Sequence, residues 1–324
     1  MILIKTPFRI SLVGGGTDFP EFFEKNGYGA VVSGAIDKYM YIVIHKYFHD
    51  KIRVKYSKTE DVDSSEQLEH PIARECLQMM KLSSGVEIAS LADVPAGLGL
   101  GSSSSFTVAL LHALHAFTGT YIAKDRLAGM ACDVEINRLG EPIGKQDQYA
   151  ASFGGLNYIR FAKGGLVSVE SLMINTETIA ELKRRLLVFH IGRPRFARDI
   201  LTEQRENLVQ PKGFELAQRL AQLADEARDA IRDGSLERVG DILDRGWQLK
   251  KDLASNISDP EIDAIYARGL EAGASGGKLL GAGRGGFMLF YCEPQFQRRL
   301  REALELRELH FEWDREGSKV IHAE

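Results

Sequence analysis

The sequence predicts an α+β protein with two domains, and three observations lead to this prediction. The chain has 324 residues, which exceeds the usual size of one domain. Its first half is rich in segments with strand character, whereas amphipathic helices dominate the second half. Because strands and helices do not alternate strictly, an α+β architecture is favoured over a βαβ-type fold. The composition changes near residues 165–185, so we expect domains at residues 1–175 and 176–324.

Segments rich in β-branched and aromatic residues mark the expected strands. Residues 38–47 (KYMYIVIHKY) predict a long strand. Residues 52–56 alternate, and a polar turn at His49 and Asp50 would let them pair with that strand. An acidic, exposed loop is expected at residues 61–69. Further strands are expected at residues 9–13, 85–89, 156–161, 186–191 and 287–292.

Helical periodicity is clearest in the second half, where apolar residues recur at i, i+3 and i+4 over residues 216–231 and 239–253. A third helix is expected to begin at Ser258, because Ser258 and Glu261 form a capping box with Pro260 in the first turn. A glycine-rich loop at residues 278–287 and a terminal hairpin across Glu316 and Gly317 complete this half. The other expected helices span residues 71–81, 106–117, 124–139, 142–153 and 295–306.

Composition excludes several classes of function. The 41 Lys and Arg residues against 45 Asp and Glu give a net charge of −4, which argues against a general nucleic-acid binder. No apolar stretch approaches the length of a membrane span, and the N-terminus lacks signal-peptide character. The three cysteines are scattered, as expected in a reducing compartment: Cys76, Cys132 and Cys292. We therefore expect a cytoplasmic protein without nucleic-acid or membrane partners, in which small anionic ligands remain open.

Residues 95–105 (PAGLGLGSSSS) carry the strongest local signal for a phosphate site. The free amides and the positive dipole end of a helix N-terminus bind anions, and glycines let the backbone approach phosphate oxygens closely. Four serines follow the glycines and add hydroxyl donors. A serine-capped helix would need only one of them, so the pattern favours phosphate binding.

Two further motifs carry groups suited to sugar and metal chemistry. Residues 7–18 (PFRISLVGGGTD) place Arg9 on a strand and Asp18 just after a glycine turn, where its carboxylate could accept hydrogen bonds from sugar hydroxyls or cap the next helix. Glu135 and Asp147 lie twelve residues apart with glycines between them. One of the two could bind Mg²⁺ and the other handle a proton, or both could be solvated helix charges.

Better-known nucleotide motifs do not fit. Gly277 and Lys278 are followed by Leu279 and lack the first glycine of a Walker A motif. Residues 281–286 (GAGRGG) match Gly-x-Gly-x-x-Gly, but they precede a strand instead of opening a helix. A nicotinamide-dependent oxidoreductase is therefore disfavoured.

Together the three motifs resemble those of the GHMP kinases, which include galactokinase, homoserine kinase, mevalonate kinase and phosphomevalonate kinase. The resemblance extends over nearly the whole chain, and residues 95–103 match the family's Pro-x-x-x-Gly-Leu-Gly-Ser-Ser pattern. It implies a two-domain GHMP kinase fold. Residues 1–175 would form an ATP-binding domain like ribosomal protein S5 domain 2, and residues 176–324 a ferredoxin-like domain.

The resemblance also implies roles for individual residues. Asp147 would be the catalytic aspartate and Arg9 its basic partner. Ser103 and Glu135 would hold Mg²⁺. The ATP phosphates would lie on Gly97, Leu98, Gly99, Gly101, Ser102, Ser103 and Ser104, and the sugar would contact Gly15, Gly16, Thr17 and Asp18.

Within the family, the Gly-Gly-Gly-Thr-Asp motif, residues 190–204 and residues 278–283 look most like D-glycero-D-manno-heptose 7-phosphate kinases. That likeness implies phosphorylation of the anomeric hydroxyl to give a 1,7-bisphosphate, with L-fucokinase-like activity as the alternative. Arg193, Arg195 and Arg198 form a basic cluster that could hold the substrate's phosphate or simply be solvated.

One residue departs from the family pattern. Arg284 stands where related kinases have a glycine, and it could crowd the phosphate loop, add a phosphate contact or point outward. It leaves open a catalytically silent sensor of sugar and nucleotide as a second alternative. The amphipathic helices of the second half are compatible with a homodimer.

Overall fold

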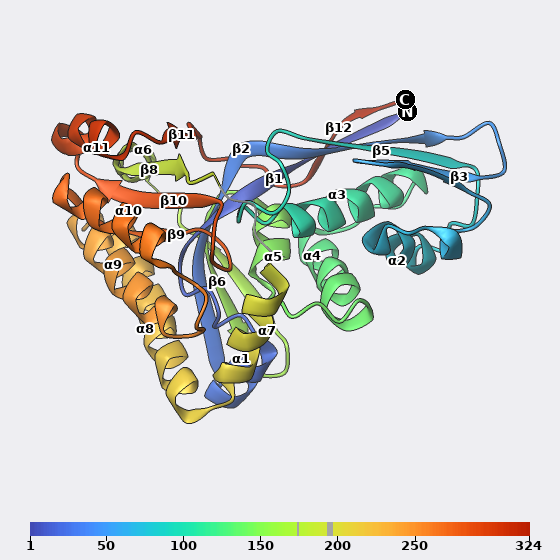
Figure 1. Ribbon diagram of the computed structural model, residues 1–324. Coiled ribbons are helices and arrows are strands. Elements are labelled where there is room, and N and C mark those ends of the chain that lie inside the picture. Colours follow the sequence, from blue (N-terminus) through green and yellow to red (C-terminus); the bar gives the residue numbers. More distant parts are fainter. Residues whose placement is uncertain (174, 193–196) are drawn as a thin grey trace.

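The computed structural model describes residues 1–173, 175–192 and 197–324, and two β-sheets organise them (Figure 1). The larger sheet has the order β12-β1-β2-β5-β3-β4, and β6 and β7 extend it from β2. The first part of β2 pairs with β6 and its last part with β5, so this long strand connects the β6–β7 pair to the rest of the sheet. The strands are β1 (Ile2–Val13), β2 (Tyr28–Lys46), β3 (Ile52–Lys55), β4 (Thr59–Val62), β5 (Val86–Ala92), β6 (Leu156–Ala162), β7 (Val167–Ser171) and β12 (Lys319–Ala323).

Helices pack against one face of this sheet. The central one, α3 (Ser102–Phe117), contacts both β1 and β2 and is buried over most of its length, which explains its almost wholly apolar sequence. Figure 1 shows α3, α4 and α5 below the sheet. The other helical segments here are α1 (Pro20–Asn26), a 3₁₀ turn (Ser65–Gln67), α2 (Pro71–Met79), α4 (Lys124–Cys132), a π-helical turn (Asp133–Arg138) and α5 (Gln146–Phe153).

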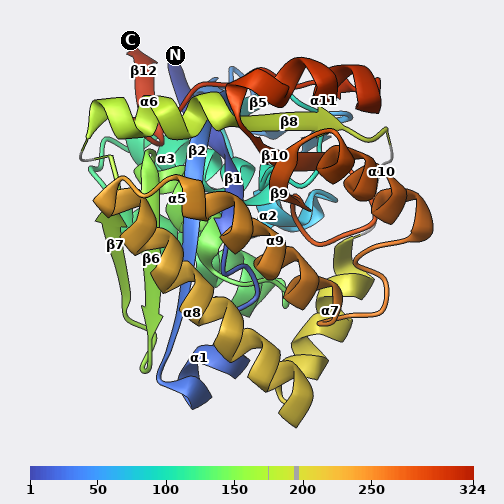
Figure 2. The same cartoon turned by 90° about the vertical axis from the view of Figure 1, so that its left-hand side faces the viewer.

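The second sheet has four strands in the order β11-β8-β10-β9, all antiparallel to their neighbours. Helices α8, α9 and α10 lie along this half in the turned view (Figure 2). Its strands are β8 (Leu186–His190), β9 (Ala274–Leu279), β10 (Phe287–Cys292) and β11 (Arg307–Glu308). Its helical segments are α6 (Thr176–Arg185), α7 (Ala197–Leu208), α8 (Pro211–Asp233), α9 (Glu237–Lys251), α10 (Pro260–Glu271), a 3₁₀ turn (Pro294–Phe296) and α11 (Gln297–Leu304).

The structure confirms the α+β class but changes several local predictions. Strand β3 pairs with β4 and, in parallel, with β5, because β5 occupies the edge of β2 that β3 was expected to take. Residues 61–69 are not only an exposed loop, because they include the end of β4 and the 3₁₀ turn. The buried Glu60 carboxylate holds the end of this segment by accepting hydrogen bonds from the amides of Glu69 and His70. Lys278 lies within β9 and not in the glycine loop.

The C-terminal segment also differs from the expected hairpin. β12 pairs antiparallel with β1 of the larger sheet, so the two chain ends lie side by side (Figure 1). The Met1 amino group donates a hydrogen bond of 2.8 Å to the carbonyl of Glu324. Within the described residues, no helix has both the length and the apolar character needed to cross a membrane.

Candidate active site

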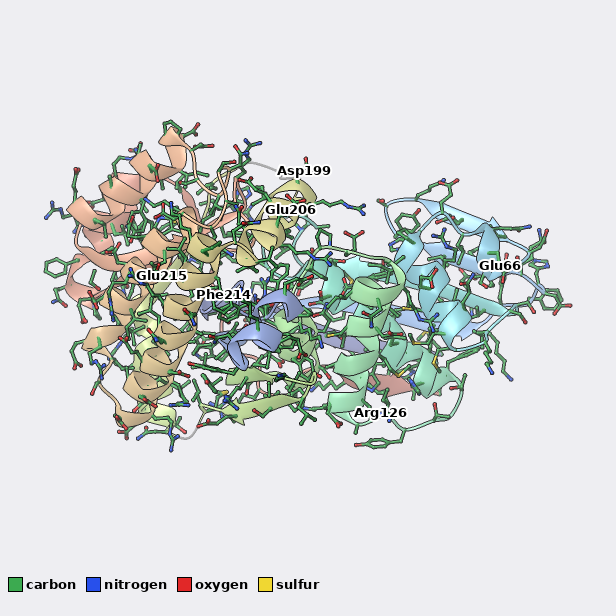
Figure 3. The ribbon with its side chains drawn as sticks, turned by 90° about the horizontal axis from the view of Figure 1, so that it is seen from below. Glu66, Arg126, Asp199, Glu206, Phe214 and Glu215 are labelled. Atoms are coloured by element: carbon green, nitrogen blue, oxygen red, sulfur yellow. The ribbon has the colours of Figure 1, made fainter. Side chains whose placement is uncertain are left out.

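A cavity of about 750 Å³ opens where the loops of the two sheets meet, and we call it the central cavity. The strand β1, the starts of α3 and α5, the π-helical turn, the end of α9 and the strand β9 all contribute to its lining. The helix α7, which carries Asp199 and Glu206 in Figure 3, lies beside the region where the two halves meet, whereas Glu66 marks the far end of the molecule. The cavity is therefore lined by segments from both halves of the chain.

The phosphate loop predicted at residues 95–105 lines this cavity. Gly97, Gly99 and Gly101 all have positive φ angles, of 81°, 90° and 76°, which bend the chain sharply into the first turn of α3. The loop and helix residues exposed to the cavity include Gly97, Gly99, Gly101, Ser102, Ser103 and Ser104. Leu98 does not line it, because its carbonyl oxygen faces the Gly286 backbone instead.

Arg9 and Asp147, which the motifs place 138 residues apart, form a bidentate ion pair in the cavity. Arg9 Nε donates to Asp147 Oδ1 and Nη2 to Oδ2, both at 2.7 Å. The third donor, Arg9 Nη1, reaches the carbonyl of Gly99 at 2.6 Å. A side chain at Gly101 would begin 3.2 Å from Asp147 Oδ2, so a glycine there keeps the loop against the pair. Planar fork-to-carboxylate pairing of this kind fixes both groups in orientation.

Glu135 belongs to the π-helical turn, lies against the first turn of α3 and is buried. Ser103 Oγ donates to its Oε1 at 2.8 Å, and Gln148 Nε2 donates to its Oε2 at 2.7 Å. Burial raises the pKa of Glu135 to about 7, since a carboxylate loses hydration inside the protein. The π-helical turn supplies this residue, so α4 does not continue as the regular helix expected to residue 139.

The backbone of the Gly-Gly-Gly-Thr-Asp turn (residues 14–18) folds back onto the carboxylate of Asp18. Its Oδ1 accepts from the Gly16 amide at 2.9 Å and its Oδ2 from the Gln146 amide at 3.1 Å, and burial raises its pKa. Gly15, Gly16 and Asp18 line the cavity. Thr17 does not, because it is fully buried and its hydroxyl exchanges hydrogen bonds with the backbone of Ala30.

The basic cluster is only partly visible. Arg193 and Arg195 lie outside the described residues. Arg198, at the start of α7, lines the cavity and forms an exposed ion pair of 3.7 Å with Glu141.

Arg284 points away from the central cavity. It is exposed, its guanidinium donates to the side-chain oxygen of Asn256, and it does not appear in the cavity lining. Its φ of 59° is a conformation that glycine adopts more easily, which accounts for the glycine usual at this position. Of the three orientations considered from the sequence, the outward one is found.

Sequence reasoning missed several cavity residues. The structure adds Lys250 from α9, Lys278 from β9 and Gln204 from α7, all of them buried. It also adds an aromatic wall in which the His70 ring lies 4.8 Å from Phe106 and 4.7 Å from Tyr56. The one usable signal was Lys278, a charged residue between glycines and leucines that lead toward an apolar strand.

Comparisons with known proteins match segments in both halves of the chain to one family. The models of the GHMP kinase N-terminal and C-terminal domains match residues 70–155 and 199–307. A D-glycero-alpha-D-manno-heptose 7-phosphate kinase of Campylobacter jejuni is 29% identical over 98% of both chains. A bifunctional fucokinase/GDP-fucose pyrophosphorylase of Arabidopsis thaliana is 27% identical over 93% of this chain, which corresponds to 31% of that longer protein.

Solved structures share the fold. The crystal structure of a D-glycero-D-manno-heptose 1-phosphate kinase from Bacteroides thetaiotaomicron superposes with a TM-score of 0.82, 25% identity and full coverage of both chains. A mevalonate kinase structure superposes with a TM-score of 0.73 over 98% of this chain. The phosphate loop, the matched domains and these relatives lead to one conclusion: the chain belongs to the GHMP kinase family and is an ATP-dependent sugar kinase.

Proposed function

We propose that this kinase phosphorylates the anomeric hydroxyl of D-glycero-D-manno-heptose 7-phosphate and releases the 1,7-bisphosphate and ADP. The observation that carries the chemistry is the Arg9–Asp147 pair, which lies between the phosphate loop and the Asp18 turn in one cavity. The choice of sugar is supported by the heptose 7-phosphate kinase relative, which aligns over 98% of both chains.

In this proposal, the amides and hydroxyls of residues 97–104 bind the ATP phosphates at the N-terminus of α3. The apolar and aromatic wall beside the loop would receive the base, and its members include Met40, Tyr56, His70, Ile72, Val94 and Phe106. Gly15, Gly16 and Asp18 would bind the sugar opposite. Residues 1–175 would then hold the nucleotide and most of the sugar site.

In this proposal, Asp147 receives the proton of the anomeric hydroxyl. The hydroxyl oxygen forms a bond to the γ-phosphorus, the bond to the β-γ bridging oxygen breaks, and the proton passes to Asp147 or onward to solvent. Arg9 holds the carboxylate in one orientation by its two hydrogen bonds, so the oxygen that meets the substrate is fixed. Phosphoryl transfer depends mainly on such positioning and on charge neutralisation.

Glu135 and Ser103 fit a Mg²⁺ site. Their oxygens are 2.8 Å apart, and the buried carboxylate would gain from a cation, since burial disfavours its charge. In the described part of the chain, no three or more His, Cys, Asp or Glu side chains gather around a point. Mg²⁺ commonly takes one or two carboxylates and completes its shell with substrate phosphates and water, which this pair allows. When bound, the ion would neutralise phosphate charge.

The test is ADP release with Mg²⁺-ATP over a panel of free sugars and their 6- or 7-phosphates. Turnover confined to heptose 7-phosphate would support the proposal, and a phosphorus NMR spectrum of the product would locate the new phosphate on C1. Turnover of L-fucose or another free sugar would replace the heptose by that substrate and leave the kinase assignment intact.

A further inference from the structure

A group of buried polar side chains lies at the acceptor end of the central cavity. Two of its members end or begin segments already noted for their likeness to heptose 7-phosphate kinases (residues 190–204 and 278–283), but no role was expected for any of them. We call it the Lys278 cluster and define it as Gln204, Lys250 and Lys278. Gln204 is fully buried, and the two lysines are each 8% exposed. All three line the cavity. They come from α7, α9 and β9, so the second half of the chain builds this cluster.

Among the described residues, the buried lysine Lys278 has no direct hydrogen-bond or ion-pair partner. Its side chain makes no hydrogen bond and no salt bridge with any residue of the described ranges. The charged groups that act on it are Lys250, Arg9 and Asp18, and burial with the two cations lowers its pKa to about 7. A buried ammonium group is costly unless an anion meets it. The side chain is therefore arranged for an anionic ligand.

Gln204 adds a second donor directed into the same space. Its Oε1 accepts a hydrogen bond of 2.8 Å from Lys250 Nζ, and an ammonium group can only donate. The amide NH₂ must therefore point the other way, where Nε2 meets no hydrogen-bond partner in the described ranges. A side chain at Gly16 would begin 2.3 Å from that buried nitrogen, so a glycine at this position makes room for the amide. Lys250 is a positioning residue here, because it also donates to the carbonyl of Gly15 and fixes the amide.

The cluster lies on the acceptor side of the reacting groups. Hydrogen bonds connect Gly99 to Arg9 and Arg9 to Asp147. The residue before Asp147 is Gln146, and its backbone amide donates to the carboxylate of Asp18. Asp18 in turn binds the Gly16 amide, beside which Gln204 lies. The phosphate loop is at one end of this series of contacts and the Lys278 cluster at the other. An anion at the cluster would thus belong to the acceptor and not to ATP.

We propose that Lys278 and Gln204 bind the phosphate group already present on the acceptor sugar, with Lys250 orienting Gln204. The inference rests on the proposed function in requiring a phosphorylated acceptor. It moves recognition of that phosphate from the arginines near the start of α7 to buried donors of β9 and α7. A buried ammonium and an oriented amide would select a sugar phosphate against the free sugar.

The experiment compares wild type with Lys278→Met, and Lys251→Met serves as a matched control. Lys251 is the next residue after Lys250 but pairs with Asp263 at 3.6 Å and does not line the cavity. KM and kcat are measured at saturating Mg²⁺-ATP for a sugar phosphate and for the same sugar without phosphate. We expect Lys278→Met to raise KM for the sugar phosphate by about 10- to 100-fold, as for a lost charged hydrogen bond, and to leave the free sugar unchanged. Lys251→Met should change neither.

Proton uptake gives a second readout that a structural role would not produce. A lysine with a pKa near 7 is mostly neutral at pH 8. A bound phosphate dianion would raise the pKa of this lysine, so that it takes up a proton from the buffer. Calorimetry at pH 8 in two buffers of different ionisation enthalpy should show about one more proton taken up by wild type than by Lys278→Met. Because Lys250, Arg9 and Asp18 are present in both proteins, the difference isolates Lys278.

The outcomes separate this inference from the proposed function. If wild type uses another sugar phosphate, the heptose assignment fails and the comparison is run on that sugar. If wild type uses only free sugars, the inference is overturned and the kinase remains. Equal losses with phosphorylated and free sugar would also overturn it, since Lys278 would then bind the transferred phosphate. Lys278→Arg, which keeps the charge, should retain part of the preference, and its melting temperature with ATP reports whether the site is folded.

Discussion

Asp147 is the residue on which the proposed chemistry depends most. In Asp147→Asn the two hydrogen bonds from Arg9 lose their charged acceptor, and the proton of the sugar hydroxyl has no base. We expect kcat to fall by about 10²- to 10⁴-fold, the usual contribution of a positioned base, while ATP affinity changes little. Steady-state kinetics and nucleotide titration measure the two effects. Asp229→Asn, at an exposed pair with Arg228 on α8, is the control. Normal turnover by Asp147→Asn would remove this residue from the chemistry.

Arg284 gives a prediction about stability instead of activity. A residue other than glycine at a φ of 59° is strained by about 1–2 kcal/mol, and the exposed hydrogen bond to Asn256 offsets only part of this. Arg284→Gly should therefore raise the free energy of unfolding by up to about 1 kcal/mol and leave kcat unchanged. Lys81→Gly, at a φ of 53° far from the loop, should stabilise to a similar extent. A loss of turnover in Arg284→Gly alone would show that the arginine takes part in the ATP site.

At the residue scale, the sequence was most informative where a motif is local. The glycines of the phosphate loop follow from a motif of neighbouring residues. The pairing of Arg9 with Asp147, which are 138 residues apart, was expected only from the resemblance to the family. The shared role of Gln204 and Lys278 could not be predicted, because the two side chains come together only when α7 and β9 pack near Gly16 and Asp18. Thr17 belongs to a local motif that predicted contact with the sugar. The motif could not show that the Thr17 hydroxyl exchanges hydrogen bonds with the backbone of Ala30 instead.

At the scale of elements, two glycine-rich loops pack directly against each other. A Cβ at Gly286 would lie 2.1 Å from the carbonyl oxygen of Leu98, so the loop before β10 supports the phosphate loop from behind. Gly286→Ala should push the phosphate loop away, destabilise the fold by about 1–3 kcal/mol through overpacking and raise KM for ATP. Urea unfolding and steady-state kinetics check both effects.

Gly164→Ala is the matched control for that prediction. Gly164 has a comparable φ, 82° against 94°, but a Cβ there would meet nothing within 4 Å. Both variants carry the same backbone strain, so the difference between them measures the contact with Leu98. If the two variants lose equal stability and both keep the KM for ATP, the glycine-rich loop at residues 281–286 does not support the phosphate loop.

The elements themselves show what a pattern can and cannot predict. Strand character over residues 38–47 marked only the end of β2, because its first part (residues 28–37) is punctuated by small residues whose burial depends on β6. Pairing of β3 with β5 could not be predicted from alternation, since the choice of partner depends on the crossover through α2. The partner of β12 was wrongly predicted for the same reason. The expected hairpin would pair it with the segment just before Gly317, whereas its register comes from β1, more than 300 residues earlier in the chain.

At the scale of the whole molecule, a partly buried histidine connects α3 to the segments near both ends of the chain. His112 on α3 hydrogen-bonds Ser318 through Nδ1 at 2.8 Å, and the Ser318 hydroxyl meets Thr6 of β1 at 2.7 Å. Burial, with lesser repulsion from His115 and Lys124, lowers the pKa of His112 to about 4. The folded protein therefore requires a neutral imidazole where α3, β1 and the segment before β12 meet.

This requirement makes stability fall in mild acid. In the unfolded chain the imidazole has a pKa of about 6.5. Between that pH and about 4, the unfolded state therefore binds a proton that the folded state does not bind. The contribution of His112 is complete above pH 6.5 and is lost as the pH falls toward 4, by about 3 kcal/mol over that window. His112→Gln keeps a polar partner for Ser318 without the titration and should flatten this part of the profile. Urea unfolding from pH 4.5 to 7.5 measures it, with the exposed His310→Gln as control. An unchanged slope in His112→Gln would mean that other groups cause the acid sensitivity, and the connection between the chain ends and α3 would not be its origin.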